Sequence, residues 1–331
     1  MRVVFWVAAP VVLLVTSLLG IAMGAISLPF ADVVYAVAGA GDPTTVAIVR
    51  SLRLPRVALA ALVGAGLGMS GASLQGSLRN ALAEPYLLGV SGGAAVGAVL
   101  AVAAAGNAGV PPGILPLASF AGAALAIGAT ILVARAGAPA AGSYSDSRVL
   151  LMAGVIIGAF ANAVIMILLA NAPPNAIRGA LWWMMGSVSG ADVPTVVWLA
   201  AYWAAGGAAL LWYARDIDIL ALGEEPAAGL GVDAASVTRK VFLLSSLIAA
   251  ATVAAAGLIG FVGLVVPHIV RSCGIRSHRS LIAGAALVGA LLVVAADLAA
   301  RTLQRPTELP LGAITAVIGV PFFLMQLRRL A

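Results

Sequence analysis

Long apolar runs recur along the chain, and they constrain its fold more than any other feature of the sequence. Ten such runs lie between charged residues, prolines and glycines, at approximately residues 3–24, 57–75, 87–105, 114–134, 149–170, 194–214, 241–256, 259–270, 281–300 and 311–327. A helix that crosses the hydrocarbon of a membrane needs about 20 apolar residues. Hydrophobic residues make up 63% of the chain and charged residues only 9%, and a soluble fold cannot bury so much apolar surface. The sequence predicts an all-α polytopic membrane protein with about ten transmembrane helices, forming a single domain over residues 1–331.

Two of the runs are unusual. The run 259–270 is too short to span a bilayer upright, and Gly257, Gly260 and Pro267 indicate a broken or re-entrant helix packed inside protein. The run 3–24 follows Arg2 as a signal peptide would, but it is longer than the apolar region of about 7–15 residues that such peptides have. We therefore expect a retained first helix and an irregular eighth one.

The basic residues indicate the orientation of these helices. With the N-terminus in the cytoplasm and the helices alternating, the cytoplasmic side receives twelve of the 18 Lys and Arg residues. The positive-inside rule then predicts a multi-pass protein with both termini in the cytoplasm. The six basic residues left on the outer side are Arg50, Arg53, Arg56, Arg178, Arg301 and Arg305.

Residues that carry chemistry are scarce. Cys273, His268 and His278 cannot form a convincing zinc or iron–sulfur site. No Gly-Lys-Ser/Thr phosphate-binding sequence occurs, and the glycines of residues 63–71 and 89–97 have the small-xxx-small spacing of closely packed membrane helices. We therefore expect no metal site, no cofactor bound by this chain, no catalytic residue and no nucleic-acid partner.

Short motifs along the chain resemble a known family. They are Leu52-Arg-Leu-Pro-Arg56, Ser70-Gly-Ala-Ser-Leu-Gln75 with Arg79-Asn-Ala-Leu-Ala-Glu-Pro85, Leu87-Leu-Gly-Val-Ser91, Trp183-Met-Met-Gly-Ser187, Ala221-Leu-Gly-Glu224, Gly260-Phe-Val-Gly-Leu-Val-Val-Pro-His-Ile-Val-Arg271, Ala296-Asp297 with Arg301, and Glu308-Leu-Pro-Leu-Gly312. In this order they resemble the permease family of ATP-binding-cassette (ABC) importers for cobalamin, heme and ferric siderophores, nearly from end to end. The family usually has Pro where this chain has Ala81, which loosens one turn.

The resemblance implies a type II ABC importer permease fold and a homodimer with the substrate pathway on its two-fold axis. The dimer would lie among the lipids of a bacterial inner membrane, with two cytoplasmic ATPase subunits that bind ATP and Mg and with a periplasmic substrate-binding protein. This chain would be a transport subunit and not an enzyme.

The arginines on the outer side are candidates for docking the binding protein. Arg presents a planar fork that pairs bidentately with carboxylates, and the resemblance supplies a surface glutamate on each lobe of the binding protein. The docking candidates are Arg53, Arg56 and Arg301. In the alternative, Asp297 holds Arg301 at the i,i+4 spacing of an ion pair and lipid phosphates hold the other two.

Three further groups of residues have expected roles. Residues 215–240 form the longest polar interruption of the apolar runs. We expect short helices there that dock on the ATPase, or else a solvated loop. The coupling candidates are Leu222, Gly223, Glu224, Glu225, Leu230 and Gly231.

By resemblance, the candidates for a cytoplasmic gate are Asn80, Leu82, Asp146 and Ser147, although these residue types also suit ordinary helix caps. The candidates for the substrate pathway are Arg178, Trp183, Met184 and Met185, because thioethers adapt to flat apolar ligands; interfacial packing is the alternative.

Two other classes of protein fit less well. A transporter driven by an ion gradient places acidic residues deep in its helices, and here only Asp297 lies there, with Arg301 one turn away. An intramembrane enzyme needs a nucleophile and base or metal ligands, which the helices lack. For the substrate, a general likeness to heme permeases favours heme over a ferric siderophore or cobalamin.

Overall fold

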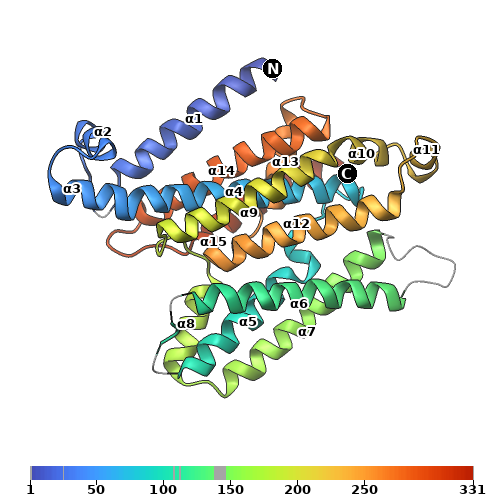
Figure 1. Ribbon diagram of the computed structural model, residues 1–331, viewed down its shortest axis with the longest axis horizontal. Helices are drawn as coiled ribbons and strands as arrows, with labels where there is room; N and C mark the ends of the chain where they lie inside the picture. The colour runs from blue at the N-terminus through green and yellow to red at the C-terminus, as the bar shows by residue number, and fades with distance from the viewer. Residues whose placement is uncertain (1, 25, 107–108, 112, 138–146, 331) are drawn as a thin grey trace.

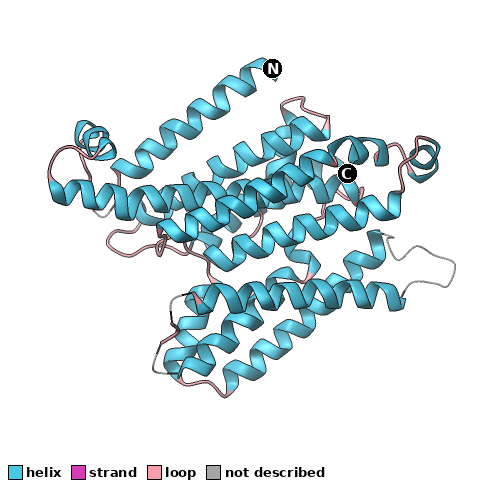
Figure 2. Ribbon diagram, viewed as in Figure 1, coloured by secondary structure: helices cyan, strands magenta, loops and turns pink. Residues whose placement is uncertain are grey.

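The regular secondary structure of the computed structural model is all helical in the part of the chain that it describes. It describes residues 2–24, 26–106, 109–111, 113–137 and 147–330, and these residues include no strand (Figure 2). The main helices are α1 (Arg2–Ala22), α4 (Leu54–Ser77), α5 (Val90–Ala105), α6 (Ile114–Gly137), α7 (Ser147–Ala170), α9 (Val193–Trp212), α12 (Ala234–Ala256), α13 (Val262–Ser272), α14 (His278–Thr302) and α15 (Leu311–Leu330). The shorter elements are α2 (Phe30–Ala38), α3 (Pro43–Ala47), the π-helical η1 (Ile48–Arg53), the 3₁₀-helical η2 (Pro85–Leu88), α8 (Pro174–Met184), α10 (Ala214–Leu220) and α11 (Glu224–Gly229).

The prediction of about ten membrane segments is confirmed. In the described residues, seven helices are long and apolar enough to cross a membrane, and three shorter apolar helices accompany them: Val90–Ala105, Val262–Ser272 and Leu311–Met325. The second segment differs from the prediction, because it is one helical stretch from Pro43 to Ser77. The Asp42 side chain accepts a hydrogen bond from the N–H of Thr45 and so caps this stretch. Helix therefore begins well before the apolar run at residue 57, in a polar segment that a search for apolar runs misses.

Helix α4 is the buried centre of the bundle, and glycines let its neighbours approach it closely. A Cβ added to Gly64 would lie 2.0 Å from the carbonyl oxygen of Gly289 in α14, and one added to Gly68 would lie 2.2 Å from that of Ala285. The second glycine-rich segment behaves in the same way, since a Cβ on Gly97 would lie 2.0 Å from the carbonyl oxygen of Ala118 in α6. The predicted small-xxx-small packing is confirmed, because the helix backbones are in contact at these glycines. In lipid, helices associate through such close packing and not through a hydrophobic driving force.

The predicted irregularity of the eighth segment is also confirmed. The α12 helix ends at Ala256, and residues 257–261 form a non-helical break before α13 begins at Val262. Helix α13 has only 11 residues, contains Pro267 and is buried along most of its length. It packs against α4 and α14, so its irregular start is enclosed by protein, as membrane depth requires.

The arrangement of the helices defines two ends of the bundle. In Figure 1, α5, α6, α7 and α8 form one group below the group built around α4, and α10 and α11 lie at the right-hand end, on the side of the C-terminus. Arg2 at the start of α1 donates a hydrogen bond to the carbonyl oxygen of Gly274, in the loop before His278, which is itself bonded to Asp218 of α10. We call this end the α11 end, and the opposite end, where α4 begins and α14 finishes, the Arg56 end.

Candidate functional site

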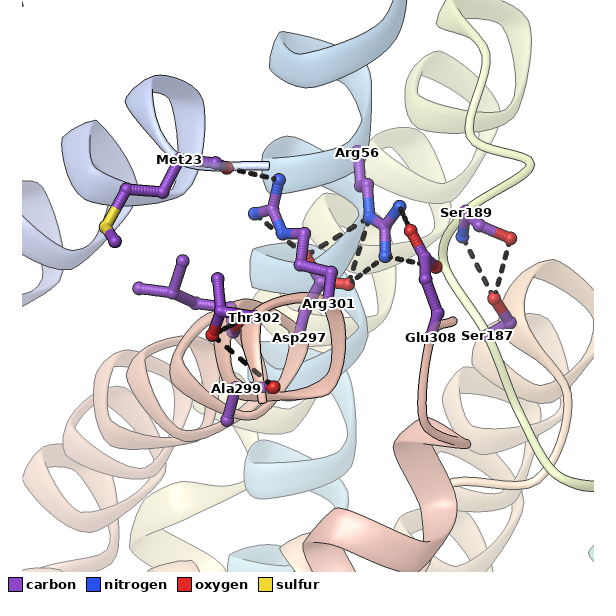
Figure 3. A network of polar contacts seen from close by, with 10 residues as sticks. Met23, Arg56, Ser187, Ser189, Asp297, Ala299, Arg301, Thr302 and Glu308 are labelled. Atoms are coloured by element: carbon purple, nitrogen blue, oxygen red, sulfur yellow. Dashed lines mark hydrogen bonds and ion pairs between the residues drawn. The ribbon is translucent and has the colours of Figure 1, made fainter. Parts of the chain in front are cut away.

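An arginine network closes the Arg56 end, and Arg56 is its centre (Figure 3). Arg56 donates to Asp297 through Nε at 3.0 Å and Nη2 at 2.8 Å, and to Glu308 through Nη1 at 2.8 Å and Nη2 at 2.9 Å. These bonds join the start of α4 to the end of α14 and to the segment before α15. The hydrogen bonds from Arg56 lower the pKa of Glu308 below its usual range. We use the name arginine network for Arg53, Arg56, Asp297, Arg301 and Glu308.

The other two arginines of the network hold the end of α1. Arg53 is buried and donates through Nη1 to the carbonyl oxygens of Ile21 and Ala22, both at 2.7 Å, and through Nη2 to that of Ile26. Arg301 donates to the carbonyl oxygen of Met23 at 3.3 Å and forms an ion pair with Asp297 at 3.0 Å. The last carbonyls of a helix have no partner within it and carry partial negative charge, so cationic donors satisfy them well.

These contacts bear on the expectation for the outer arginines. The i,i+4 pair of Asp297 and Arg301 is confirmed. However, Arg53 and Arg301 are buried and Arg56 is largely so, so the guanidinium forks face partners within the chain and not an open surface. Glu308 begins the motif Glu308-Leu-Pro-Leu-Gly312, and nothing in this local sequence indicates that it pairs with Arg56. Docking of another protein by Arg53, Arg56 and Arg301 stays a prediction.

Short helices with two exposed leucines occupy the α11 end. Leu222 and Leu230 are 65% and 62% exposed and flank α11, and Gly223 and Gly231 have positive φ angles of 116° and 80° that form the turns on either side. Glu224 forms an ion pair with Arg79 in the segment after α4, and Glu225 is exposed. The predicted short helices are confirmed, and they present apolar side chains outward.

This group of short helices is fastened to the bundle at a second point. Asp218 of α10 accepts hydrogen bonds from the backbone N–H of His278 at 2.9 Å and pairs with its Nδ1 at 2.6 Å. His278 is the first residue of α14. Sequence reasoning considered His278 only as a metal ligand. Among the residues that the structure describes, no group of three or more His, Cys, Asp or Glu side chains could hold a metal ion.

Two of the four candidate gate residues, Asn80 and Leu82, lie in the segment between α4 and α5. The Asn80 side chain accepts a hydrogen bond from the N–H of Leu82 at 2.9 Å, and Leu82 is 46% exposed. Both line a cavity of about 320 Å³ against Met152 and Val155 of α7. Asp146 lies outside the described residues, and Ser147 begins α7.

The same segment carries two polar groups that reach the break between α12 and α13. Glu84 accepts from the N–H of Phe261 at 2.8 Å, and the Tyr86 hydroxyl accepts from that of Ile259 at 2.9 Å. Burial raises the pKa of Glu84 to about 7, although the bond from Phe261 lowers it. Sequence reasoning assigned no role to either side chain, because the pairs are separated by more than 170 positions.

Two larger cavities continue from the gate cavity toward the Arg56 end. One of about 340 Å³ is lined by Tyr86, Asn162, Val155, Met184 and Leu258 among others, so it shares Val155 with the gate cavity. The next, of about 440 Å³, shares Met184 and Leu258 with it and reaches Met185 and the start of α15. We call these three cavities the cavity row. Of the pathway candidates, Met184 and Met185 line it, while Trp183 is half-buried beside them and Arg178 is exposed on α8.

The fold defines the class of protein first. A bundle of about ten apolar helices with a row of cavities between its two polar ends has the architecture of a multi-pass membrane protein. The family model described as "FecCD transport family" matches residues 12–329, and the chain belongs to this family.

Comparisons with known proteins agree with this assignment. The chain is 43% identical to the cobalamin import system permease protein BtuC of Halobacterium salinarum over 296 residues, covering 87% of this chain and 75% of the relative. It is 38% identical to the ABC transporter permease protein YvrB of Bacillus subtilis, covering 96% and 91%. A solved structure described as an inward-facing conformation of a metal-chelate type ABC transporter is similar with a TM-score of 0.86 and 27% identity, covering 99% of this chain and all of that one. The protein is thus an ABC importer permease with the expected fold, and such permeases are transport subunits rather than enzymes.

Proposed function

We propose that this permease carries a bulky metal chelate of the cobalamin class through the cavity row into the cytoplasm. The observation that carries the proposal is the row itself, which runs from Met185 past Tyr86 to Leu82 with mostly apolar walls. A wall of thioether, small apolar residues and isolated polar groups suits a large, partly apolar ligand. The relatives named for cobalamin and vitamin B12 import favour cobalamin over the heme expected from the sequence.

The substrate is tested with the cognate binding protein and the reconstituted importer. We expect the optical spectrum of the co-purified binding protein to show corrinoid bands, and unlabelled cyanocobalamin to compete with labelled cyanocobalamin for ATP-dependent uptake. A heme absorption band, with uptake of hemin and not of cyanocobalamin, would refute the cobalamin proposal and support heme. ATP-independent uptake driven by an ion gradient would refute the importer class.

The cavity row also supports a homodimer. It is lined along one side by α7 and the start of α15, and both helices keep large apolar side chains exposed, among them Phe160 and Val317. A second copy would cover these faces and complete the pathway on a two-fold axis, with lipid around the remaining helices. We expect cross-linking of a Phe160→Cys variant between two copies in the bacterial inner membrane; a monomer in membranes that transports normally would contradict the dimer.

The α11 end is proposed to face the cytoplasm and bind two ATPase subunits that carry ATP and Mg, one for each permease chain. Exposed Leu222 and Leu230 beside the acidic start of α11 would fill an apolar cleft on the ATPase. Both termini lie toward this end, so they would be cytoplasmic. Changing both leucines to Asp should reduce ATP-driven uptake at least tenfold and weaken assembly with the ATPase. The matched control is Leu303→Asp, which is equally exposed but lies at the Arg56 end; unchanged assembly in the double variant would contradict the proposal.

The Arg56 end is proposed to dock the periplasmic binding protein. Because Arg53 and Arg301 are buried, reversing their charges would damage the fold and would not test docking alone. Glu308 is the exposed carboxylate that occupies the Arg56 fork, with a side chain 43% exposed. A glutamate of the binding protein would have to compete with it. We therefore expect Glu308→Gln to tighten docking about threefold, whereas Glu225→Gln at the other end should not. Equal affinity of wild type and Glu308→Gln would leave Arg56 with a structural role only.

The segment of Asn80 and Leu82 is proposed to close the cytoplasmic end of the cavity row. It covers the last cavity against α7, and Asp146 and Ser147 precede or begin the same helix. In a Cys273→Ser background, cross-linking of a Leu82→Cys variant across the dimer should differ between the ATP-bound and nucleotide-free states. The same yield in both states would contradict a gate here.

A further inference from the structure

Two side chains, Glu84 and Tyr86, converge on the break between α12 and α13. Glu84 and Tyr86 lie in the segment that also carries the gate residues Asn80 and Leu82. Their oxygens accept hydrogen bonds from the backbone N–H groups of Phe261 and Ile259, at 2.8 and 2.9 Å. One segment is thus bonded twice to the main chain of another that is far away in the sequence.

The break requires such partners. The first N–H groups of a helix have no acceptor within it, and a buried N–H without a partner is unfavourable. Phe261 precedes α13 with a φ of 68°, a left-handed conformation that non-glycine residues rarely adopt. A carboxylate at a helix N-terminus also interacts favourably with the partial positive charge there. Glu84 therefore caps α13 from outside.

The next turn of α13 depends on a third side chain in the same way. Pro267 has no N–H, so the carbonyl oxygen of Gly263, four residues earlier, lacks its helical donor. Gln75 of α4 donates to this oxygen at 3.3 Å and to that of Leu264 at 3.2 Å, and accepts from Arg271 at 2.6 Å. The start of α13 is therefore fixed to α4 as well as to the gate segment.

The break and the gate segment also meet on the cavity row. Tyr86 lines the middle cavity beside Leu258, which belongs to the break. Leu258, Gly260 and Phe261 line the cavity nearer the Arg56 end. A shift of the break would change the shape of both cavities and, through Glu84 and Tyr86, pull on the gate segment.

We propose that Glu84 and Tyr86 are positioning residues that fasten the gate segment to the break between α12 and α13, so that the gate moves only together with the wall of the cavity row. This proposal rests on the proposed function for the role of Leu82 as part of a gate. The bonds themselves are those of the structure. They link the opening toward the cytoplasm to the shape of the space that the substrate occupies.

The test measures the exposure of the gate directly. In the purified permease–ATPase complex with Cys273→Ser, a Leu82→Cys reporter is labelled with a maleimide. We expect Glu84→Ala to raise the labelling rate at least fivefold and Tyr86→Phe at least twofold. Glu84→Gln keeps an oxygen acceptor for Phe261 and should stay within twofold of wild type. Amide exchange of residues 257–261 should rise in the same order.

Controls separate this role from a general loss of stability. A Leu303→Cys reporter at the Arg56 end, also exposed, should be labelled at the same rate in all variants. Equal acceleration at both reporters would overturn the proposal, as would unchanged labelling of Leu82→Cys in Glu84→Ala and Tyr86→Phe. If Glu84→Ala fails to assemble, Tyr86→Phe and Glu84→Gln still decide, because one removes an acceptor and the other keeps it.

The outcome can be told apart from a failure of the proposed function. Labelling is measured without substrate and does not depend on which chelate is carried. Absence of ATP-dependent uptake by the wild type would refute the proposed function, whereas the labelling result would still report whether Glu84 and Tyr86 hold this segment in place. In the working importer, we expect Glu84→Ala to hydrolyse at least three times more ATP for each substrate carried, with Glu84→Gln restoring the wild-type ratio.

Discussion

Asp297 is the carboxylate that Arg56 and Arg301 share, and replacing it by Asn should destabilise the protein strongly. Asn keeps the size of the side chain and one acceptor oxygen, so the change isolates the charge. The Asp297 side chain is 3% exposed, and its partners lie at 2.8 and 3.0 Å. Removing one partner of a buried ion pair costs about 3–5 kcal/mol, because it leaves a buried charge uncompensated. Glu308→Gln also removes a negative charge that pairs with Arg56, but the Glu308 side chain is 43% exposed. An exposed pair contributes under about 1 kcal/mol.

The assay is reversible unfolding in mixed micelles with increasing dodecyl sulfate, followed by circular dichroism. We expect the free energy of unfolding to fall several times further for Asp297→Asn than for Glu308→Gln. The double variant Asp297→Asn with Arg301→Met should recover part of the loss, since Met fills similar space without a charge. Equal effects of the two single variants, or no recovery in the double variant, would refute the view that uncompensated charge within the network sets the cost.

Three further predictions concern single contacts. Gly64→Ala should cost about 1–3 kcal/mol of unfolding free energy, because its Cβ would meet the backbone of α14. Gly128→Ala, in a helix with open space around it, should be neutral or slightly stabilising. Equal changes of the unfolding free energy in the two variants would contradict the close packing of α4 on α14. Gln75→Leu should cost about 1–3 kcal/mol in the same assay, since the carbonyl of Gly263 loses its donor, and an unchanged midpoint would show that this bond adds nothing. The pKa of Glu308 is lowered in the folded protein, so its stabilisation should be present near pH 7 and be lost as the pH falls through the folded pKa. The midpoints of wild type and Glu308→Gln should therefore converge in acid, and a difference that stays constant through the whole acid titration would contradict the ion pair.

The membrane segments could be predicted because hydrocarbon imposes a simple rule on the sequence. Apolar length identified the ten apolar helices of the described residues, and small residues at every fourth position predicted close packing of α4 without identifying α14 as its partner. The same rule failed at the start of the second segment. Residues 43–56 are helical because Asp42 caps them and Arg53 and Arg56 find partners in other helices, and neither cause is visible in an apolar window.

The polar contacts were less predictable for a related reason. The pair of Asp297 and Arg301 is local and follows from helix geometry, so it could be anticipated. Arg56 meets Asp297 across 241 positions, and Glu84 meets Phe261 across 177. Such pairs depend on how helices pack, which hydropathy does not encode. Positive charge on the expected outer side therefore set these arginines apart but did not predict the partners that they have within the chain.

Helix α14 joins the two ends of the molecule in a mechanical sense. Its first residue is bonded to Asp218 of α10 at the α11 end, and Asp297 and Arg301 near its last turn belong to the arginine network. The 25 residues of this helix make a rod about 37 Å long at 1.5 Å per residue. Glycine contacts hold the middle of α14 against α4, and this contact can serve as a pivot. If α14 tilts as a rigid body about this pivot, its two ends move in opposite directions. A displacement at the α11 end is then transmitted to the Arg56 end.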